Sequence, residues 1–216
     1  MLKKCSILLL ALALCANAAE GQTTLDYQGK RFRYTLLVDS ALSADSVNYN
    51  CAVKSITIYT SSGDKVQTIQ PPENGCSCSL PKDRVFIVED VNFDGNEDIR
   101  LLQFLPAGPN LPYFYWTSDP VARRFKRQKA LEAITSPNFD PAKKLITSFW
   151  RSSCCDHGLS VYRYINGKLV LIEESEVAQD ENDDKKYITT VKKRVRGKMT
   201  LVKRTVKIEK EGTDRL

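Results

Sequence analysis

The sequence predicts a mainly β protein, built as an antiparallel β-sandwich or an open barrel. Many short segments rich in β-branched and aromatic residues alternate with turn residues, and few segments show a helical period. The chain has 216 residues, of which 42% are hydrophobic and 27% are charged. This composition is typical of a globular protein and excludes a fibrous or wholly disordered chain. The length allows one domain, or two small ones, with a core of its own.

The N-terminus has the pattern of a secretory signal peptide covering residues 1–18. Lys3 and Lys4 precede an apolar run that ends at Cys15, and a triplet of small residues ends at Ala18. Cleavage after Ala18, or alternatively after Gly21, gives a periplasmic or secreted protein. A lipid anchor on Cys15 is the less favoured alternative, because a leucine precedes it. No later stretch approaches ~18 consecutive apolar residues, so we expect no transmembrane span.

After the signal, residues 19–179 form the predicted β domain. The proline- and glycine-rich stretches 71–75 and 106–112 are expected to be loops. Segment 121–134 is either a strand with a turn or a short helix. The other predicted strands are 31–38, 52–60, 66–70, 84–89, 99–105, 113–117 and 144–150.

Two hairpins are predicted in the C-terminal part of the chain. Asn166-Gly167 suits a type I′ turn, and pairing outward from it puts Tyr162 and Tyr164 on one face with Leu171 and Leu169. We expect that face to belong to the core. The second hairpin, 187–195 with 198–208 about Arg196-Gly197, carries apolar and basic residues on both faces and should be peripheral.

Positive charge is concentrated in the segment 180–216, which we expect to pack on the β domain or to extend it. The formal net charge of the whole chain is +6, and ten basic residues but no acidic one lie between Lys185 and Lys207. Nucleic acid is not an expected partner after export. A charged edge that resists aggregation is one interpretation. The other is electrostatic contact with an acidic enzyme or the anionic envelope through Lys192, Lys193, Arg194 and Arg196.

The clearest chemical motif is the acidic loop, residues 90–98. Oxygen-bearing side chains occupy its first, third, fifth and ninth positions, Gly95 permits a sharp turn, and the seventh residue can offer its backbone carbonyl. This pattern predicts a Ca²⁺ site between two strands, without the glutamate that helix-loop-helix sites carry at the twelfth position. The alternative is a solvated acidic turn. The predicted ligands are Asp90, Asn92, Asp94, Asn96 and Asp98.

Export makes disulfides the leading interpretation of the cysteines that remain after signal cleavage. Five thiols leave one unpaired in five ways, and the other four pair in three ways, so fifteen patterns are open. A bond between adjacent Cys154 and Cys155 would be strained, so we expect at least one of them to reach the 76–78 segment. A zinc site including His157 is an alternative with untypical spacing. The disulfide candidates are Cys51, Cys76, Cys78, Cys154 and Cys155.

The sequence favours a binding protein over an enzyme. The one histidine, His157, is the only residue around which a Ser-His-Asp or Cys-His arrangement can be built. No phosphate-binding glycine loop and no His-Glu-x-x-His motif occurs. A hydrolase that uses two carboxylates is the alternative, and it leaves no fixed sequence signature.

Several motifs between Val85 and Glu174 occur in an order shared with a known family. They are the segment 88–98, the aromatic run 113–116 with Phe125, the segments 138–140 and 144–148, and the hairpin segments 162–164 and 167–173. In these motifs the chain resembles exported bacterial β proteins that include immunity proteins of antibacterial secretion systems and are similar in fold to periplasmic lysozyme inhibitors.

The resemblance implies a calcium-stabilised periplasmic protein that inhibits a peptidoglycan-cleaving enzyme by placing a loop in its cleft. The Ser-Gly-x-Tyr loop of lysozyme inhibitors is absent, and the nearest candidate is the segment 152–158. Arg151, Asp156 and His157 are the expected contact residues. The alternative function is an accessory module that binds envelope carbohydrate through outward-facing aromatics among residues 113–116.

Overall fold

The computed structural model describes residues 22–42, 49–72 and 80–208 of the chain, with the side chains of 40–42 and 49–51 excepted. These residues form three antiparallel sheets that follow one another in chain order, and none of the sheets closes into a barrel. The mainly β fold predicted from the sequence is therefore confirmed, in its sandwich-like form. The predicted signal peptide lies outside the described residues.

The first sheet has the order β1-β2-β3-β4. Its central strands follow the predicted segments, and the turn before β4 contains Gly63 at φ 99°. The sequence did not predict β1, because its residues are mostly polar and only two of them are hydrophobic. Its strands are β1 (Gln22–Gln28), β2 (Phe32–Leu42), β3 (Tyr49–Thr60) and β4 (Lys65–Ile69).

The second sheet has the order β5-β6-β7-β8 and lies between the other two. A one-turn helix precedes it, and a 3-10 turn follows it, so the undecided segment 121–134 contains a strand and then this turn. Its elements are α1 (Lys82–Val85), β5 (Phe86–Glu89), β6 (Asp98–Leu102), β7 (Tyr113–Asp119), β8 (Arg124–Arg127) and η1 (Lys129–Ala133).

The third sheet has the order β14-β13-β12-β11-β10-β9. Both predicted hairpin turns are confirmed, with positive φ at Asn166-Gly167 (50° and 73°) and at Arg196-Gly197 (50° and 85°). The sequence did not predict the short strand at Pro137–Asp140. The strands are β9 (Pro137–Asp140), β10 (Leu145–Arg151), β11 (His157–Ile165), β12 (Lys168–Asp180), β13 (Asp183–Val195) and β14 (Lys198–Ile208).

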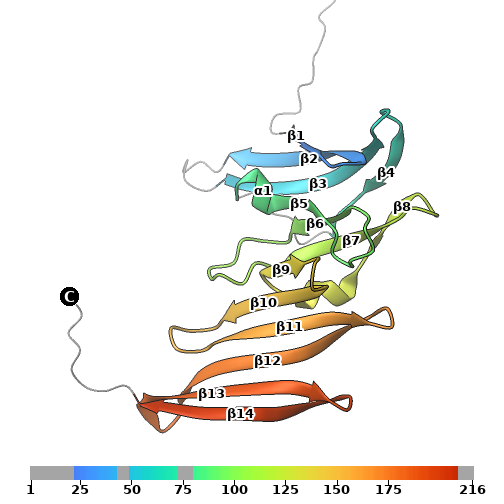
Figure 1. The fold of residues 1–216 in the computed structure, drawn as a ribbon. Helices are drawn as coiled ribbons and strands as arrows, with labels where there is room; N and C mark the ends of the chain where they lie inside the picture. Colours follow the sequence, from blue (N-terminus) through green and yellow to red (C-terminus); the bar gives the residue numbers. More distant parts are fainter. Residues whose placement is uncertain (1–21, 43–48, 73–79, 209–216) are drawn as a thin grey trace, which may run out of the picture.

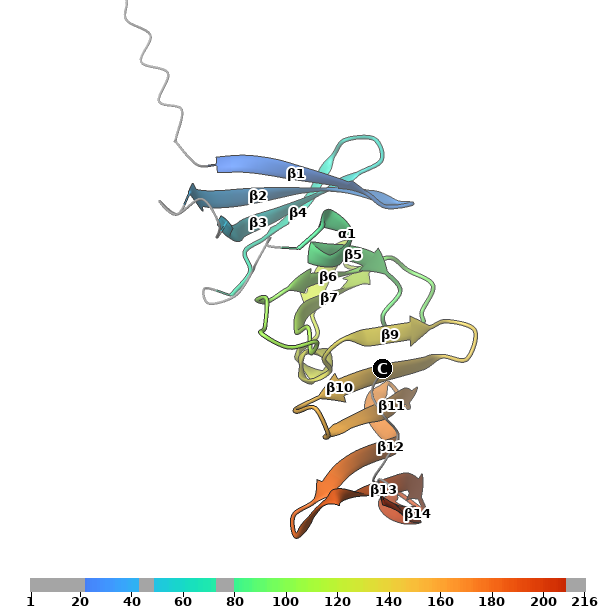
Figure 2. The same cartoon turned by 90° about the vertical axis from the view of Figure 1, so that its left-hand side faces the viewer.

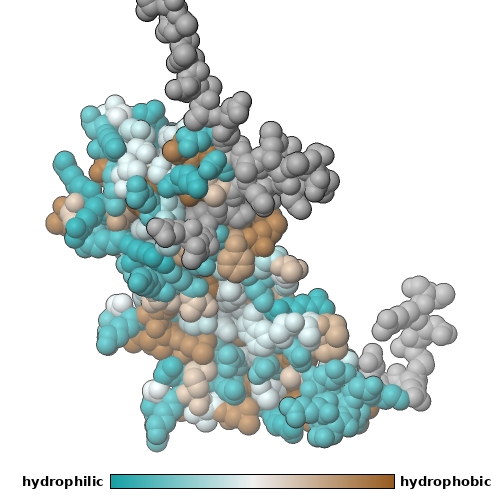
Figure 3. Space-filling view, turned by 180° about the vertical axis from the view of Figure 1, so that it is seen from behind, coloured by the Kyte–Doolittle hydropathy of each residue, from teal (hydrophilic) through white to brown (hydrophobic). Residues whose placement is uncertain are grey.

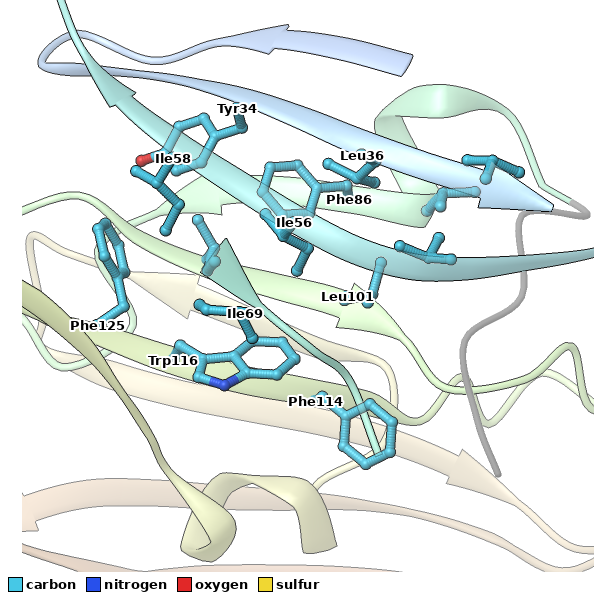
Figure 4. Close-up of a cluster of buried hydrophobic side chains, with 14 residues drawn as sticks. Tyr34, Leu36, Ile56, Ile58, Ile69, Phe86, Leu101, Phe114, Trp116 and Phe125 are labelled. Atoms are coloured by element: carbon cyan, nitrogen blue, oxygen red, sulfur yellow. The ribbon is translucent and has the colours of Figure 1, made fainter. Parts of the chain in front are cut away.

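Two hydrophobic clusters fill the spaces on either side of the second sheet. The cluster against the first sheet contains Phe114 and Trp116 of β7 (Figure 4). The cluster that includes side chains of the third sheet contains Tyr113 and Tyr115 of the same strand. All four aromatic side chains are buried, because β7 has a layer on each face. The expectation that half of residues 113–116 face outward to bind carbohydrate is therefore wrong.

The last strands of the third sheet extend past the packed layers. Figures 1 and 2 show β12, β13 and β14 at the end of the molecule farthest from β1, with no other sheet over them. Leu201 is 52% exposed and Ile208 is 63% exposed. Hydrophobic side chains therefore share this surface with basic ones (Figure 3), as expected for a peripheral hairpin.

No helix in the described part of the chain is long and apolar enough to cross a membrane. The helical elements beside the second sheet, α1 and η1, have four and five residues.

Gly158 lies where the third sheet has no room for a side chain. A Cβ atom there would lie 2.6 Å from the carbonyl oxygen of Ser175 and 2.6 Å from Cε2 of Trp150. We expect Gly158→Ala to lower the free energy of unfolding by about 1–3 kcal/mol, because backbone or indole must move. Urea denaturation measures this loss. Gly108→Ala is the control, since nothing lies within 4 Å of its added carbon, and equal stability of both variants would contradict the packing argument.

Candidate functional site

The acidic loop connects β5 and β6, and its side chains accept hydrogen bonds from its own backbone. Asp90 accepts from the N–H groups of Asp94 (3.1 Å) and Gly95 (2.7 Å). Asn92 Oδ1 accepts from the N–H of Asp94 at 3.1 Å, and Asp94 Oδ1 accepts from the N–H of Asn96 at 2.8 Å. These bonds fix the side chains of the first, third and fifth positions within one tight turn.

The acidic loop contacts all three sheets. Glu97 accepts hydrogen bonds from the backbone N–H groups of Lys30 and Arg31, in the turn between β1 and β2. Phe93, at φ 62°, packs with its ring centroid 6.3 Å from that of Phe139 and 6.4 Å from that of Tyr164, both in the third sheet. A change in this loop therefore affects the junction of the three layers.

Asp98 is fully buried, and its carboxylate connects the loop to β7. It accepts hydrogen bonds from the N–H groups of Val91 (3.1 Å) and Ser118 (2.8 Å). Burial raises the pKa of Asp98 to about 7, against the lowering effect of these two hydrogen bonds, and the charges of Asp94 and Asp90 raise it further. The ninth position thus has a structural role in the fold, besides the ligand role predicted for it.

The oxygen atoms of the acidic loop are of the kind that bind a hard cation such as Ca²⁺. Asp90 and Asp94 supply carboxylates, and the Asn92 amide nitrogen donates to Asp94 Oδ2 at 2.9 Å while its oxygen accepts from the backbone N–H of Asp94. Asn96 Oδ1 instead accepts a hydrogen bond from Arg31 at 2.8 Å, which leaves its backbone carbonyl as the predicted ligand. Within the described residues, no three His, Cys, Asp or Glu side chains form a metal-binding group. The calcium site stays a prediction.

The predicted contact residues lie in the segment 151–157, called the contact loop below, which joins β10 to β11. Arg151 is exposed, and its guanidinium donates to the carbonyl oxygens of Ser153 (2.8 Å) and Cys154 (3.1 Å). Asp156 accepts from the Ser153 hydroxyl at 2.9 Å and from the N–H of Gln179 at 3.2 Å. Two of the three predicted contact side chains therefore also hold the loop in its conformation.

His157, the third predicted contact residue, begins β11 and is half-buried. Its ring centroid lies 6.0 Å from that of Phe149 in β10. No pattern in the sequence pointed to Asn110, in the loop after β6, whose amide group bonds the carbonyl (2.8 Å) and the N–H (2.9 Å) of Arg151. A separation of 41 residues hides this contact from any local pattern.

Among the predicted disulfide candidates, Cys154 and Cys155 are free thiols in the contact loop. Cys76 and Cys78 lie outside the described residues, as does the side chain of Cys51 in β3. The predicted bridge from the contact loop to the 76–78 segment therefore stays a prediction.

The basic residues of the C-terminal hairpin differ in their contacts. The Nζ atom of Lys192 in β13 lies 3.8 Å from Oε2 of Glu174 in β12. The Nζ atom of Lys193 lies 3.0 Å from Oε2 of Glu173. Arg194 donates to the carbonyl oxygen of Leu171 at 2.7 Å. By contrast, three lysines of the edge strand β14 form no ion pair with any residue in the described ranges. They are Lys198, Lys203 and Lys207.

Comparison with known proteins identifies the fold. A Xanthomonas protein related to a type IV secretion system has a similar structure, with a TM-score of 0.59 over 83% of this chain and 93% of that one, at 17% identity. Two further structures match with TM-scores below 0.3. The C-terminal domain of a bacteriophage phiKZ protein has 0.28 at 11% identity, covering 80% of this chain and 43% of that one. A Bacteroides fragilis chain described as a 6-phosphogluconolactonase has 0.27 at 11% identity, covering 84% and 70%.

No protein-family model matches the chain, and no curated protein matches it in sequence. At 17% identity the likeness to the Xanthomonas protein concerns the fold alone.

Proposed function

We propose that this chain is an exported, calcium-stabilised binding protein that inhibits a peptidoglycan-cleaving enzyme by means of its contact loop. The observation that carries the proposal is the conformation of this loop, whose residues 151–154 are exposed and yet held by hydrogen bonds that Arg151 and Asn110 donate and Asp156 accepts. A loop ordered before binding loses little conformational entropy on association, which is how rigid inhibitors reach high affinity. The fold shared with a secretion-system-related protein supports an envelope setting.

The alternative of a carbohydrate-binding module has less support, because residues 113–116 are buried on both faces of β7. We therefore place the binding surface at the contact loop, at the opposite end of β11 from the Asn166-Gly167 turn (Figure 1).

The test measures inhibition of a panel of lysozymes and lytic transglycosylases acting on peptidoglycan. We expect at least one enzyme to lose activity, and Ser152→Trp in the contact loop to weaken that inhibition by roughly tenfold, about 1.4 kcal/mol. Lys168→Trp is the matched control, because this exposed residue lies at the opposite end of the same hairpin. If every enzyme keeps full activity, or both tryptophan variants weaken inhibition equally, the contact loop is not the inhibitory element.

Calcium binding is expected to stabilise the fold, because the acidic loop contacts all three sheets. At a calcium concentration of about 100 times Kd, the expected gain in the free energy of unfolding is about 2.7 kcal/mol. Thermal unfolding with calcium and with chelator measures the difference. Asp94→Ala should remove it, whereas Asp64→Ala, in the turn before β4, should keep it. A melting temperature that chelator leaves unchanged would show that calcium does not stabilise the fold.

The edge strand β14 is expected to speed association with an acidic enzyme. Replacing Lys198, Lys203 and Lys207 by Gln should lower the association rate roughly tenfold at low salt and flatten its salt dependence. Stopped-flow mixing at several ionic strengths measures both quantities. Replacing Lys192 and Lys193 by Gln is the comparison, because glutamates already offset their charges. An unchanged rate for the β14 variant would leave this strand only its role as a charged sheet edge.

A further inference from the structure

The contact loop holds two thiol groups against each other at the surface. Sγ of Cys154 and Sγ of Cys155 lie 2.8 Å apart, and neither residue is in a disulfide. Cys154 is exposed and Cys155 is partly buried. Successive side chains of an extended strand point to opposite faces, so the proximity of these two requires the bent backbone of the contact loop.

Hydrogen bonds on both sides of the thiols maintain this bend. The N–H groups of Ser152 and Ser153 both donate to the carbonyl oxygen of Asp156, at 2.9 Å and 3.3 Å. The N–H of Cys155 donates to Ser153 Oγ at 3.1 Å, and the carbonyl of Cys154 accepts from Arg151. The thiol pair is therefore a fixed feature of the loop.

We propose that Cys154 and Cys155 form a reversible thiol–disulfide exchange site. Its oxidant is a disulfide-bearing molecule in the compartment to which the protein is exported. The thiolate of one cysteine attacks a sulfur of the donor disulfide and displaces one thiolate. The thiolate of the second cysteine then attacks the first cysteine's sulfur in the mixed disulfide and displaces the other thiolate. Two cysteine thiols are oxidised to one disulfide, and the donor disulfide is reduced to two thiols, which take up the two protons.

The covalent geometry makes this site labile and distinguishes it from a permanent cross-link. Adjacent Cα atoms lie ~3.8 Å apart, whereas relaxed disulfides span ~4.4–6.8 Å between Cα atoms. A disulfide within the pair is therefore strained, and strained, exposed disulfides are readily reduced. The hydrogen bond with Cys155 raises the pKa of Cys154. Exchange that starts at Cys154 should therefore accelerate at alkaline pH.

Oxidation also changes the surface of the contact loop. Closing the ring reorients the Cys154-Cys155 peptide, whose carbonyl at Cys154 accepts the Arg151 hydrogen bond. If oxidation controls how the contact loop binds its target enzyme, that control rests on the function proposed above. The exchange reaction itself does not rest on that function. The experiment below therefore reads the chemistry directly and needs no target enzyme.

A single tryptic peptide isolates the site from the other cysteines. Trypsin cleaves after Arg151 and Arg163, and the peptide 152–163 contains Cys154 and Cys155 but no other cysteine. The reduced protein is treated with oxidised glutathione at pH 8, alkylated, digested and analysed by mass spectrometry. We expect this peptide to carry no alkyl group and no link to another peptide. Its mass should be lower than that of the reduced, unalkylated peptide by two hydrogen atoms. Reduction with dithiothreitol should restore both alkylation sites.

Single-cysteine variants provide the controls. Cys155→Ser leaves the exposed Cys154, which should retain one glutathione because no second thiol displaces it. Cys154→Ser should react more slowly, because Cys155 is partly buried. The proposal is overturned if the oxidised wild-type peptide is linked to one containing Cys51, Cys76 or Cys78. It is equally overturned if the peptide stays reduced or carries two glutathiones.

Discussion

Replacing Arg100 by Met is expected to lower the free energy of unfolding by about 3–5 kcal/mol at pH 8. Arg100 extends from β6, and its Nε lies 2.6 Å from Oε1 of Glu89 in an ion pair that lacks the alignment of a hydrogen bond. Its guanidinium stacks 4.6 Å from the ring centroid of Tyr113 and 5.6 Å from that of Phe139. Removing it leaves the Glu89 carboxylate uncompensated in a partly buried position.

The cost of Arg100→Met should depend on pH. Burial raises the pKa of Glu89 above its ordinary 4.5, and the charge of Arg100 lowers it. Without Arg100 the pKa of Glu89 in the folded state rises further. The variant therefore loses stability as the pH rises above 4.5, and it regains stability as the pH falls and Glu89 becomes protonated. Urea denaturation at pH 4.5 and pH 8 measures the difference. The cost at pH 4.5 should be smaller, because protonated Glu89 tolerates burial.

A double variant separates the ion pair from packing. Arg100→Met combined with Glu89→Gln should recover about 1–3 kcal/mol relative to Arg100→Met alone, since no buried charge is left unpaired. If Arg100→Met is as stable as the parent at pH 8, or if its cost is the same at both pH values, the ion pair does not stabilise the junction of the second and third sheets.

Phe86→Ala is expected to lower the free energy of unfolding by about 3–5 kcal/mol, because it opens a cavity between the first and second sheets. Phe86 begins β5 and is 2% exposed, and its ring centroid lies 4.9 Å from that of Tyr27 and 5.3 Å from that of Tyr34. Those partners lie in the first sheet, so the ring holds two layers together (Figure 4).

Denaturation followed by circular dichroism and by tryptophan fluorescence measures this effect, since Trp116 lies in the same cluster. Phe104→Ala is the matched control, because Phe104 is 53% exposed and its loss should change stability by no more than about 0.5 kcal/mol. A Phe86→Ala variant that unfolds at the same urea concentration as Phe104→Ala would show that the first sheet does not depend on this contact.

Local patterns in the sequence were sufficient to predict most strands and the sharpest turns. β-branched and aromatic segments predicted the central strands of all three sheets. Asn166-Gly167 and Arg196-Gly197 predicted two hairpins, because positive φ at consecutive residues restricts which dipeptides fit. The polar strand β1 and the short strand β9 were not predicted. Their pairing with β2 and β10, which confers strand structure on them, depends on the neighbour more than on their own residues.

The candidate sites could be located from the sequence, but their surroundings could not. The spacing of oxygen-bearing residues identified the acidic loop, whereas its contacts with Lys30, Phe139 and Ser118 join residues far apart in the chain. The contact loop was identified only by a resemblance, and its hydrogen bonds with Asn110 had no signal in the sequence.

By itself, the sequence determined the β class of this protein, its two C-terminal hairpins and the spacing of the oxygen-bearing residues in the acidic loop. These properties depend on interactions between residues close in the chain, where period and turn chemistry are visible. Only the tertiary structure decided that the sheets stack in three layers, that residues 113–116 are buried on both faces, and that Cys154 and Cys155 meet at the surface. Those features depend on which faces of the sheets pack together. Side chains along β7 alternate between its two faces whether one face or both are covered, so the sequence of β7 alone does not distinguish the two cases.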